Sequence, residues 1–185
     1  MEAIVQKGLE PKNIDYEAEY TLDREKREFQ RDIGWFGKYC FPKALAKDTP
    51  PFHRDIYKQL KSDETKRVLI AAPRGTAKST VCSLIFPLYK IAYKKPEEDL
   101  FIVVVSESQA QSVNFLSRIK YHLDHSENFK HIFGDFSSAT ARRWTGADII
   151  LKNGTRIVAV GTGQRVRGFI EGDTRPNVII VDDFE

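Results

Sequence analysis

The stretch that decides the fold is Val68-Leu69-Ile70-Ala71-Ala72-Pro73-Arg74-Gly75-Thr76-Ala77-Lys78-Ser79-Thr80. Its first five residues are apolar and predict a buried strand, and an apolar helical pattern begins directly after Thr80. A strand, a tight turn and a helix start in this order are typical of a phosphate-binding loop. The N–H groups of such a turn and the N-terminus of the helix attract an anion. We therefore predict that this segment binds the phosphates of a nucleotide.

Each polar residue of this loop has an expected role. Lys78 is expected to reach the β- and γ-phosphates of ATP, and the Ser79 hydroxyl to ligate Mg²⁺ beside them. Arg74 is expected to contact the γ-phosphate and to stabilise charge in the transition state. The predicted nucleotide-binding residues are Pro73, Arg74, Gly75, Thr76, Ala77, Lys78, Ser79 and Thr80.

The loop departs from the pattern G-x-x-x-x-G-K-[ST] at both glycine positions. Ala72 and Ala77 stand where those glycines belong, and Gly75 alone remains. If the backbone at Ala77 must adopt a positive φ, the methyl group costs roughly 1–2 kcal/mol, which phosphate binding could offset. The alternative is an ordinary strand–turn–helix in which Lys78 and Ser79 stand together by chance.

A second half-site is predicted near the end of the sequence. The apolar run 178–181 predicts a buried strand that leads into Asp182 and Asp183. Because side chains alternate along a strand, Asp182 shares the face of Ile180 and is expected to hold Mg²⁺ directly or through water. Asp183 would orient and deprotonate the attacking water, a role that Glu185 could take instead because it has the same strand parity. The alternative for paired acids after a strand is a helix N-cap.

The remaining pattern predicts an α/β fold. The sequence has 185 residues, 41% of them hydrophobic, which suffices for one core, and its net charge of +3 allows a polyanionic partner without demanding one. Leu100–Val105 predicts another buried strand, and Asn153-Gly154 between 148–151 and 155–160 predicts a β-hairpin. The order of elements predicts a mainly parallel sheet sandwiched by helices.

Helices are expected on both sides of the loop. Apolar spacing predicts one helix from about Thr21 to Pro42, a second over about 52–60, and a third after the loop with a kink at Pro87. Residues 1–20 lack this periodicity and are expected to form a loose arm before a domain of residues 21–185.

The sequence also indicates in which cellular compartment the protein is expected. Cys40 and Cys82 lie in apolar helical stretches, which favours reduced core thiols over a disulfide or a metal pair. No apolar stretch approaches the roughly 18 residues of a membrane span. We therefore expect a soluble intracellular protein with no membrane partner.

In order and content these motifs resemble the ATPase domain of the large terminase subunit of tailed bacteriophages, the motor that pumps DNA into a capsid. The similarity extends over residues from about 35 to 185 and rests on the order of several short segments. The segments are Tyr39-Cys40-Phe41-Pro42, Phe52-His53-Arg54, Ala72-Pro73-Arg74-Gly75, Lys78-Ser79-Thr80, Val105-Ser106-Glu107-Ser108, Asn153-Gly154, Arg167-Gly168, Arg175-Pro176 and Asp182-Asp183.

The resemblance implies a P-loop NTPase fold of the additional-strand type that hydrolyses ATP with Mg²⁺. It implies that Arg167 acts as an arginine finger on a neighbour's ATP, and that Phe52 and His53 border the adenine. The implied partners are double-stranded DNA, the terminase small subunit and the portal protein. The working motor would be a homo-oligomeric ring in the cytoplasm of the infected bacterial host.

The resemblance further implies that these 185 residues are a piece of a longer protein. In this type of fold the strand after Asp182 and Asp183 lies between their own strand and the strand of the phosphate-binding loop. We expect the sequence to end before that strand and before the nuclease domain typical of the family.

Two other functions stay open at this point. Ala-Pro-x-Gly-x-x-Lys-Ser-Thr also resembles motif I of superfamily 2 helicases, although 182–185 do not match the Asp-Glu-x-His or Asp-Glu-x-Asp usual there. A non-hydrolysing, nucleotide-dependent assembly protein is favoured by Ala77 and by the short side chain of Asp183. The helicase-like and terminase readings share the same phosphoryl chemistry and differ in what is moved.

Overall fold

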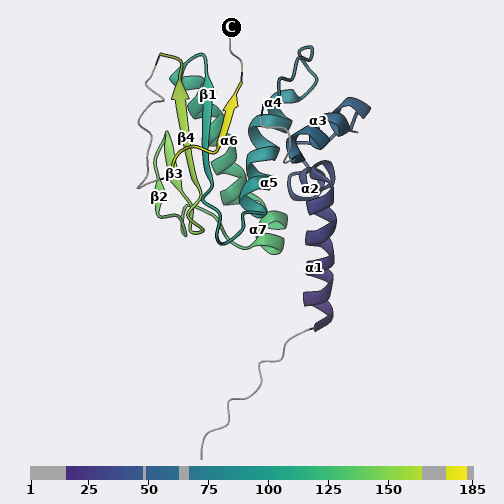
Figure 1. Ribbon diagram of the computed structural model, residues 1–185. Helices are drawn as coiled ribbons and strands as arrows, with labels where there is room; N and C mark the ends of the chain where they lie inside the picture. The colour runs from purple at the N-terminus through teal and green to yellow at the C-terminus, as the bar shows by residue number, and fades with distance from the viewer. Residues whose placement is uncertain (1–15, 48, 63–66, 164–173, 183–185) are drawn as a thin grey trace, which may run out of the picture.

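A five-stranded mixed sheet forms one side of the described structure, and helices pack against it (Figure 1). The computed structural model describes residues 16–47, 49–62, 67–163 and 174–182. The strands are β1 (Phe101–Ser106), β2 (Arg143–Trp144), β3 (Asp148–Ile150), β4 (Arg156–Gly161) and β5 (Val178–Val181). The helical elements are α1 (Tyr16–Arg31), α2 (Ile33–Cys40), α3 (Pro51–Lys61), α4 (Lys78–Thr80), the π-helix η1 (Val81–Ile85), α5 (Phe86–Ala92), α6 (Gln109–His125) and α7 (Glu127–Phe133).

The sheet combines parallel and antiparallel pairs in the order β2-β3-β4-β1-β5. Strand β1 is parallel to both β4 and β5, whereas β3 is antiparallel to β2 and β4. The predicted strand in 100–105, the predicted strand 178–181 and the hairpin around Asn153-Gly154 are therefore confirmed. The prediction of a mainly parallel sheet is corrected to a mixed sheet. The pairs β2–β3 and β3–β4 are antiparallel, and the pairs β1–β4 and β1–β5 are parallel.

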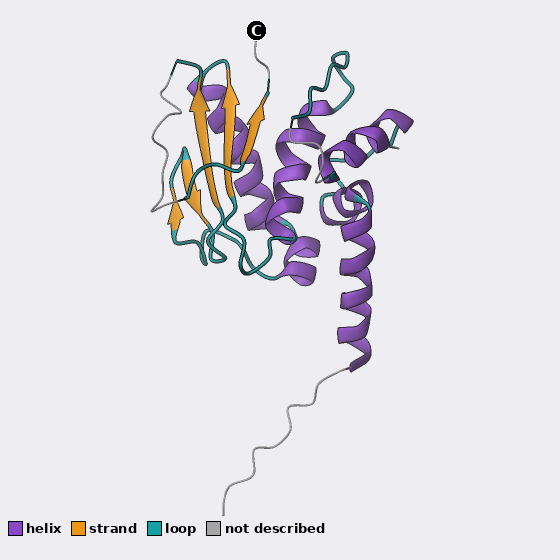
Figure 2. Cartoon of the chain, viewed as in Figure 1, coloured by secondary structure: helices purple, strands orange, loops and turns teal. Residues whose placement is uncertain are grey.

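The helices of the described residues lie on one face of the sheet (Figure 2). Alternate residues of β1, such as Ile102 and Val104, join the large core that the helices complete. On the opposite face the buried cluster contains strand residues only, namely Phe101, Val103, Val105, Val158 and Val160. The expected sandwich with helices on both faces is thus wrong for the described part of the chain.

The predicted strand over 68–72 does not form. Residues 67–73 are irregular, and the side chains of Val68 and Leu69 are 39% and 95% exposed. A strand needs a hydrogen-bonded neighbour, and an isolated extended segment is not stable in water. In the described chain β5 is the edge strand and pairs with β1, and no strand pairs with 68–72, so this segment lacks the hydrogen-bonded neighbour that a strand needs.

The edge position of β5 also corrects its predicted burial. Ile180 is buried against the helical layer, but Ile179 and Val181 on the other face are 57% and 56% exposed. The sequence run is uniformly apolar, so it does not reveal that only one of its faces is covered.

The single helix predicted from Thr21 to Pro42 is two helices, α1 and α2. The chain breaks at Asp32, whose extended backbone and carboxylate cap the start of α2 by accepting from the N–H groups of Gly34 and Trp35. Helix α1 begins at Tyr16, so the predicted arm of residues 1–20 is too long, and residues 1–15 lie outside the described part. None of the described helices combines the length and the apolar character that a membrane crossing requires.

The helix after the loop is confirmed, and its middle is a π-helix. The N–H of Phe86 donates to the carbonyl of Val81, five residues earlier, so the turn is wider than an α-helical turn. Pro87 follows directly and has no N–H to donate to the carbonyl of Ser83 four residues before it. The wide turn therefore stands where the sequence predicts a disturbance of the helix.

The start of α6 packs closely against the end of β4. The Gln109 side chain donates to the carbonyl of Ala159 at 3.1 Å and accepts from the N–H of Gly161 at 2.8 Å. A Cβ at Gly161 would lie 2.5 Å from the Gln109 nitrogen, so only glycine fits there. This contact holds α6 on the face of the sheet where η1 also packs.

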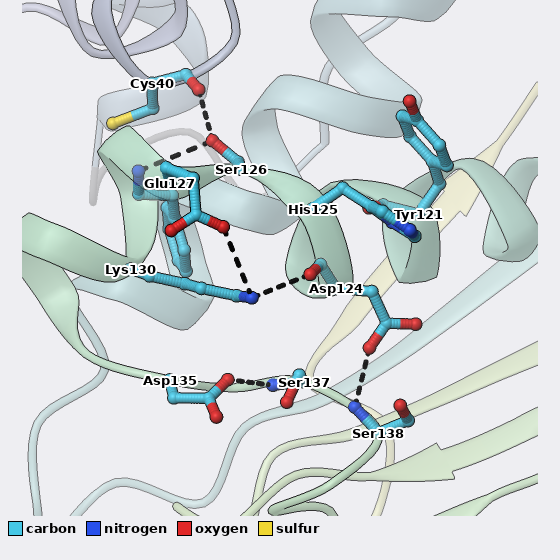
Figure 3. A network of polar contacts seen from close by, with 11 residues as sticks. Cys40, Tyr121, Asp124, His125, Ser126, Glu127, Lys130, Asp135, Ser137 and Ser138 are labelled. Carbon is cyan, nitrogen blue, oxygen red and sulfur yellow. Dashed lines mark hydrogen bonds and ion pairs between the residues drawn. The ribbon is translucent and has the colours of Figure 1, made fainter.

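A network of polar contacts joins the ends of α2, α6 and α7 (Figure 3). The hydroxyl of Ser126 caps α7 and donates to the carbonyl of Cys40 at 2.5 Å. Lys130 donates to the carbonyl of Asp124 at 2.7 Å, and the Asp124 carboxylate accepts from the N–H of Ser138 at 2.7 Å. These bonds hold α2, α6 and α7 together in the layer of helices that packs against the sheet.

Candidate nucleotide site

The loop of residues 73–80, which the sequence predicts to bind phosphate, and the end of β5 meet at one carboxylate. Ser79 Oγ at the start of the helix donates to Asp182 Oδ1 at 3.1 Å, although the two residues are 103 positions apart. Ser83 Oγ, one helical turn further along, donates to the other oxygen, Oδ2. The expectation that these two segments lie together is therefore confirmed, and so is the expectation that Asp182 shares the face of Ile180.

The loop has the backbone geometry of an anion-binding turn. Gly75 has φ 79°, and Ala77 has φ 58° and ψ 20°, in the left-handed region. The Thr76 hydroxyl donates to the carbonyl of Pro73 at 2.7 Å and closes the turn. Among the described residues, no carbonyl accepts from the N–H groups of Gly75, Thr76 or Ala77. Successive N–H donors in a turn with left-handed residues form the kind of concavity that binds anions.

The Lys78 ammonium folds back over the loop. Its Nζ donates to the carbonyl of Ala72 at 2.8 Å, so the side chain spans the turn from the helix start to the end of the segment 68–72. Lys78 is half-buried there. A cation held at the mouth of a turn with available N–H groups adds to their attraction for an anion.

His53 holds the backbone of the loop through a hydrogen bond. It is 4% exposed on α3, and its Nε2 donates to the carbonyl of Thr76 at 2.7 Å. A carbonyl can only accept, so the proton of this ring is on Nε2. Phe52 beside it is 38% exposed, with its ring centroid 4.6 Å from that of His53. The placement of both residues next to adenine, implied by the resemblance, stays a prediction.

The Asp182 carboxylate acts on its surroundings as a negative charge. Burial raises the pKa of the neighbouring Cys82 thiol to about 12, and the charge of Asp182 adds to the shift. Burial likewise raises the pKa of Cys40 to about 12. Both thiols are free, and the predicted core position is confirmed for Cys40, which is buried, whereas Cys82 is partly buried.

Other predicted site residues are placed only in part. Arg74 lies on the exposed turn, and Thr80 ends the short helix α4. Asp183, Glu185 and Arg167 lie outside the described residues, so their proposed catalytic roles stay predictions.

Sequence reasoning missed the contribution of Ser83. The signal was available, because Ser79 and Ser83 are four residues apart on a predicted helix and share one face. The sequence does not show where the Asp182 carboxylate lies, because that position depends on how the helix packs against β5.

The positive φ at Ala77 predicts a stabilising substitution. We expect Ala77→Gly to raise the free energy of unfolding by about 0.5–1 kcal/mol, since glycine removes a left-handed cost of roughly 1–2 kcal/mol but adds chain entropy to the unfolded state. Urea denaturation measures the change. Ala72→Gly, at the other glycine position of the motif, is the matched control and should lower stability, because Ala72 does not have a positive φ. Equal losses in both variants would contradict the strain assigned to Ala77.

Two segments far apart in the sequence thus form one site that offers N–H donors, an ammonium group and several oxygen ligands. Hydroxyl and carboxylate oxygens come from Ser79 and Asp182, and N–H groups come from the loop. A search with protein-family models gave no match to this sequence, and neither did a search of curated proteins.

Proposed function

We propose that this protein binds and hydrolyses Mg²⁺-ATP as the ATPase domain of a DNA-packaging motor of the large terminase type. The observation that supports the nucleotide site is the contact between Ser79 and Asp182, which joins a phosphate-binding loop to a carboxylate at the end of a parallel strand. Clefts outside the carboxyl ends of parallel strands are the usual ligand sites of α/β sheets.

The donors at this contact fit Mg²⁺. Magnesium prefers oxygen ligands and is usually held by one or two protein groups together with phosphate oxygens and water. The Ser79 hydroxyl and an Asp182 oxygen lie 3.1 Å apart and would hold the ion between them and the phosphates. When bound, Mg²⁺ would neutralise charge on the β- and γ-phosphate oxygens.

The loop residues would bind the phosphates directly. The N–H groups of 75–77 have no carbonyl partner in the described chain and would donate to phosphate oxygens. Lys78 would exchange the neutral carbonyl of Ala72 for a charged phosphate oxygen, which is the stronger acceptor. His53 holds the carbonyl of Thr76 away from the phosphates, so that the opposite side of the turn presents its donors.

For hydrolysis we propose that Asp183 or Glu185 orients the attacking water. Arg74 from the turn and Arg167 from a neighbouring subunit would stabilise the charge that develops on the transferred phosphoryl group.

Coupling to DNA rests on the resemblance alone. We propose double-stranded DNA as the moved substrate, a homo-oligomeric ring as the working form, and the terminase small subunit and the portal protein as partners in the cytoplasm of an infected bacterium.

The test is nucleotide binding and turnover by the purified protein. Calorimetric titration with ATP, with Mg²⁺ and with EDTA, should show Mg²⁺-dependent binding, and phosphate release should rise when linear double-stranded DNA is added. Stimulation by single-stranded DNA only would favour a helicase-like ATPase. Binding without turnover would favour a nucleotide-dependent assembly protein, and absence of binding would contradict the site.

A further inference from the structure

Two hydroxyl groups hold the two oxygens of the Asp182 carboxylate. Ser79 Oγ donates to Oδ1 and Ser83 Oγ donates to Oδ2. The two serines differ in access, because Ser79 is half-exposed at the loop whereas Ser83 is 0% exposed between the helix and the sheet. A ligand in the loop can therefore touch Ser79 and Asp182 but cannot touch Ser83.

Because a ligand can reach Ser79 but not Ser83, the two hydroxyl groups have different roles in the proposed site. In the proposed function, the Ser79 oxygen would be a ligand of Mg²⁺ and would thus have a second partner besides Oδ1. Ser83 is buried away from the loop, so its hydrogen bond to Oδ2 can persist with the metal absent or bound. A carboxylate with one oxygen fixed keeps the other aimed in one direction.

We propose that Ser83 is a positioning residue that holds Oδ2 of Asp182 and so keeps Oδ1 directed at the metal. This inference rests on the proposed function, because it concerns the same Mg²⁺ site. Groups that hydrogen-bond a metal-ligating carboxylate from behind fix its orientation and strengthen metal binding.

The helix geometry around Ser83 supports this assignment. Ser83 lies in the centre of η1, and the wide turn precedes Pro87, which cannot donate to the Ser83 carbonyl. Single wide turns of this kind inside helices are frequent at functional sites. Residues four apart lie on one helix face, so one carboxylate placed against that face accepts from both serines.

Ser83→Ala tests the role through the Mg²⁺ requirement of nucleotide binding. With fluorescent mant-ATP as the probe, Mg²⁺ is titrated at a fixed nucleotide concentration, and binding in EDTA is measured separately. We expect Ser83→Ala to need about tenfold more Mg²⁺, within the range typical of such supporting residues, with binding in EDTA unchanged. Ser112→Ala is the matched control, since Ser112 is also 0% exposed but donates to helix carbonyls, and its Mg²⁺ requirement should equal that of the wild type.

The outcomes separate this inference from the proposed function. A wild-type protein whose mant-ATP binding ignores Mg²⁺ overturns both. A wild-type protein that requires Mg²⁺, together with an unchanged requirement in folded Ser83→Ala, overturns the role of Ser83 alone. If Ser83→Ala does not fold, Ser83→Cys keeps the size with a weaker donor and should raise the Mg²⁺ requirement severalfold, and an unchanged requirement there also overturns it.

Discussion

Lys78→Ala should lower the affinity for Mg²⁺-ATP by about 100-fold and leave the fold intact. A hydrogen bond to a charged group contributes about 1.5–3 kcal/mol, and tenfold in affinity corresponds to about 1.4 kcal/mol. Within the described residues, Lys78 donates to the carbonyl of Ala72 in its own loop, so little of the core depends on it. Calorimetric titration with Mg²⁺-ATP measures the affinity, and circular dichroism checks the fold.

Lys90→Ala is the matched control for Lys78→Ala. Lys90 lies on α5, further along the same continuous helical segment, and faces Glu98 at 3.9 Å instead of the loop. Removal of Lys90 takes away one positive charge from the same helix and should leave nucleotide affinity within about twofold, since such exposed pairs contribute little. Equal affinities of the Lys78→Ala variant and the wild type would reject Lys78 as the phosphate ligand.

Asp182→Asn should reduce Mg²⁺-dependent phosphate release by about 100-fold or more, as expected on the loss of a group that organises charge in the transition state. Asparagine keeps the size of aspartate, and its amide oxygen and NH₂ group can pair with the hydroxyls of Ser79 and Ser83. The fold should therefore persist while the negative charge is lost. Phosphate release at saturating ATP over a range of Mg²⁺ concentrations is the measurement.

The Cys82 thiol gives a second readout of the same substitution. The anionic carboxylate disfavours a neighbouring thiolate, so Asp182→Asn should lower the pKa of Cys82 from about 12, while burial, the larger cause, keeps it above the ordinary value. The pH dependence of alkylation by iodoacetamide measures this shift. Asp124→Asn, which removes a carboxylate that accepts from the N–H of Ser138, is the control and should change neither the Cys82 pKa nor the Mg²⁺ dependence. Retention of full activity in Asp182→Asn would exclude this carboxylate from the site.

The elements that the sequence predicts well are those whose signal is local. The hairpin depends on Asn153-Gly154, where Gly154 has φ 82°. The break between α1 and α2 was also local, since Asp32 is a strong N-cap, but the apolar spacing across it was continuous and concealed it.

The predictions that the structure corrects concern strands, because strand formation depends on which other strands lie beside the segment. The run 68–72 is as apolar as 101–105, yet only the second is a strand, because in the described chain only the second pairs with neighbouring strands. The exposed residues Ile179 and Val181 illustrate the same limit, since an apolar run does not state how many of its faces or edges are covered.

The sequence by itself determined the place of the tight turn and of its backbone strain at Ala77, because both depend on residues that are neighbours in the chain. It also determined the face of Asp182, because strand alternation depends only on parity. Only the tertiary structure decided that Ser83 joins Ser79 at Asp182, that His53 holds the carbonyl of Thr76, and that β5 is an edge strand. Those facts depend on which elements pack together, and the free energy of packing is a sum over contacts between residues far apart in the chain.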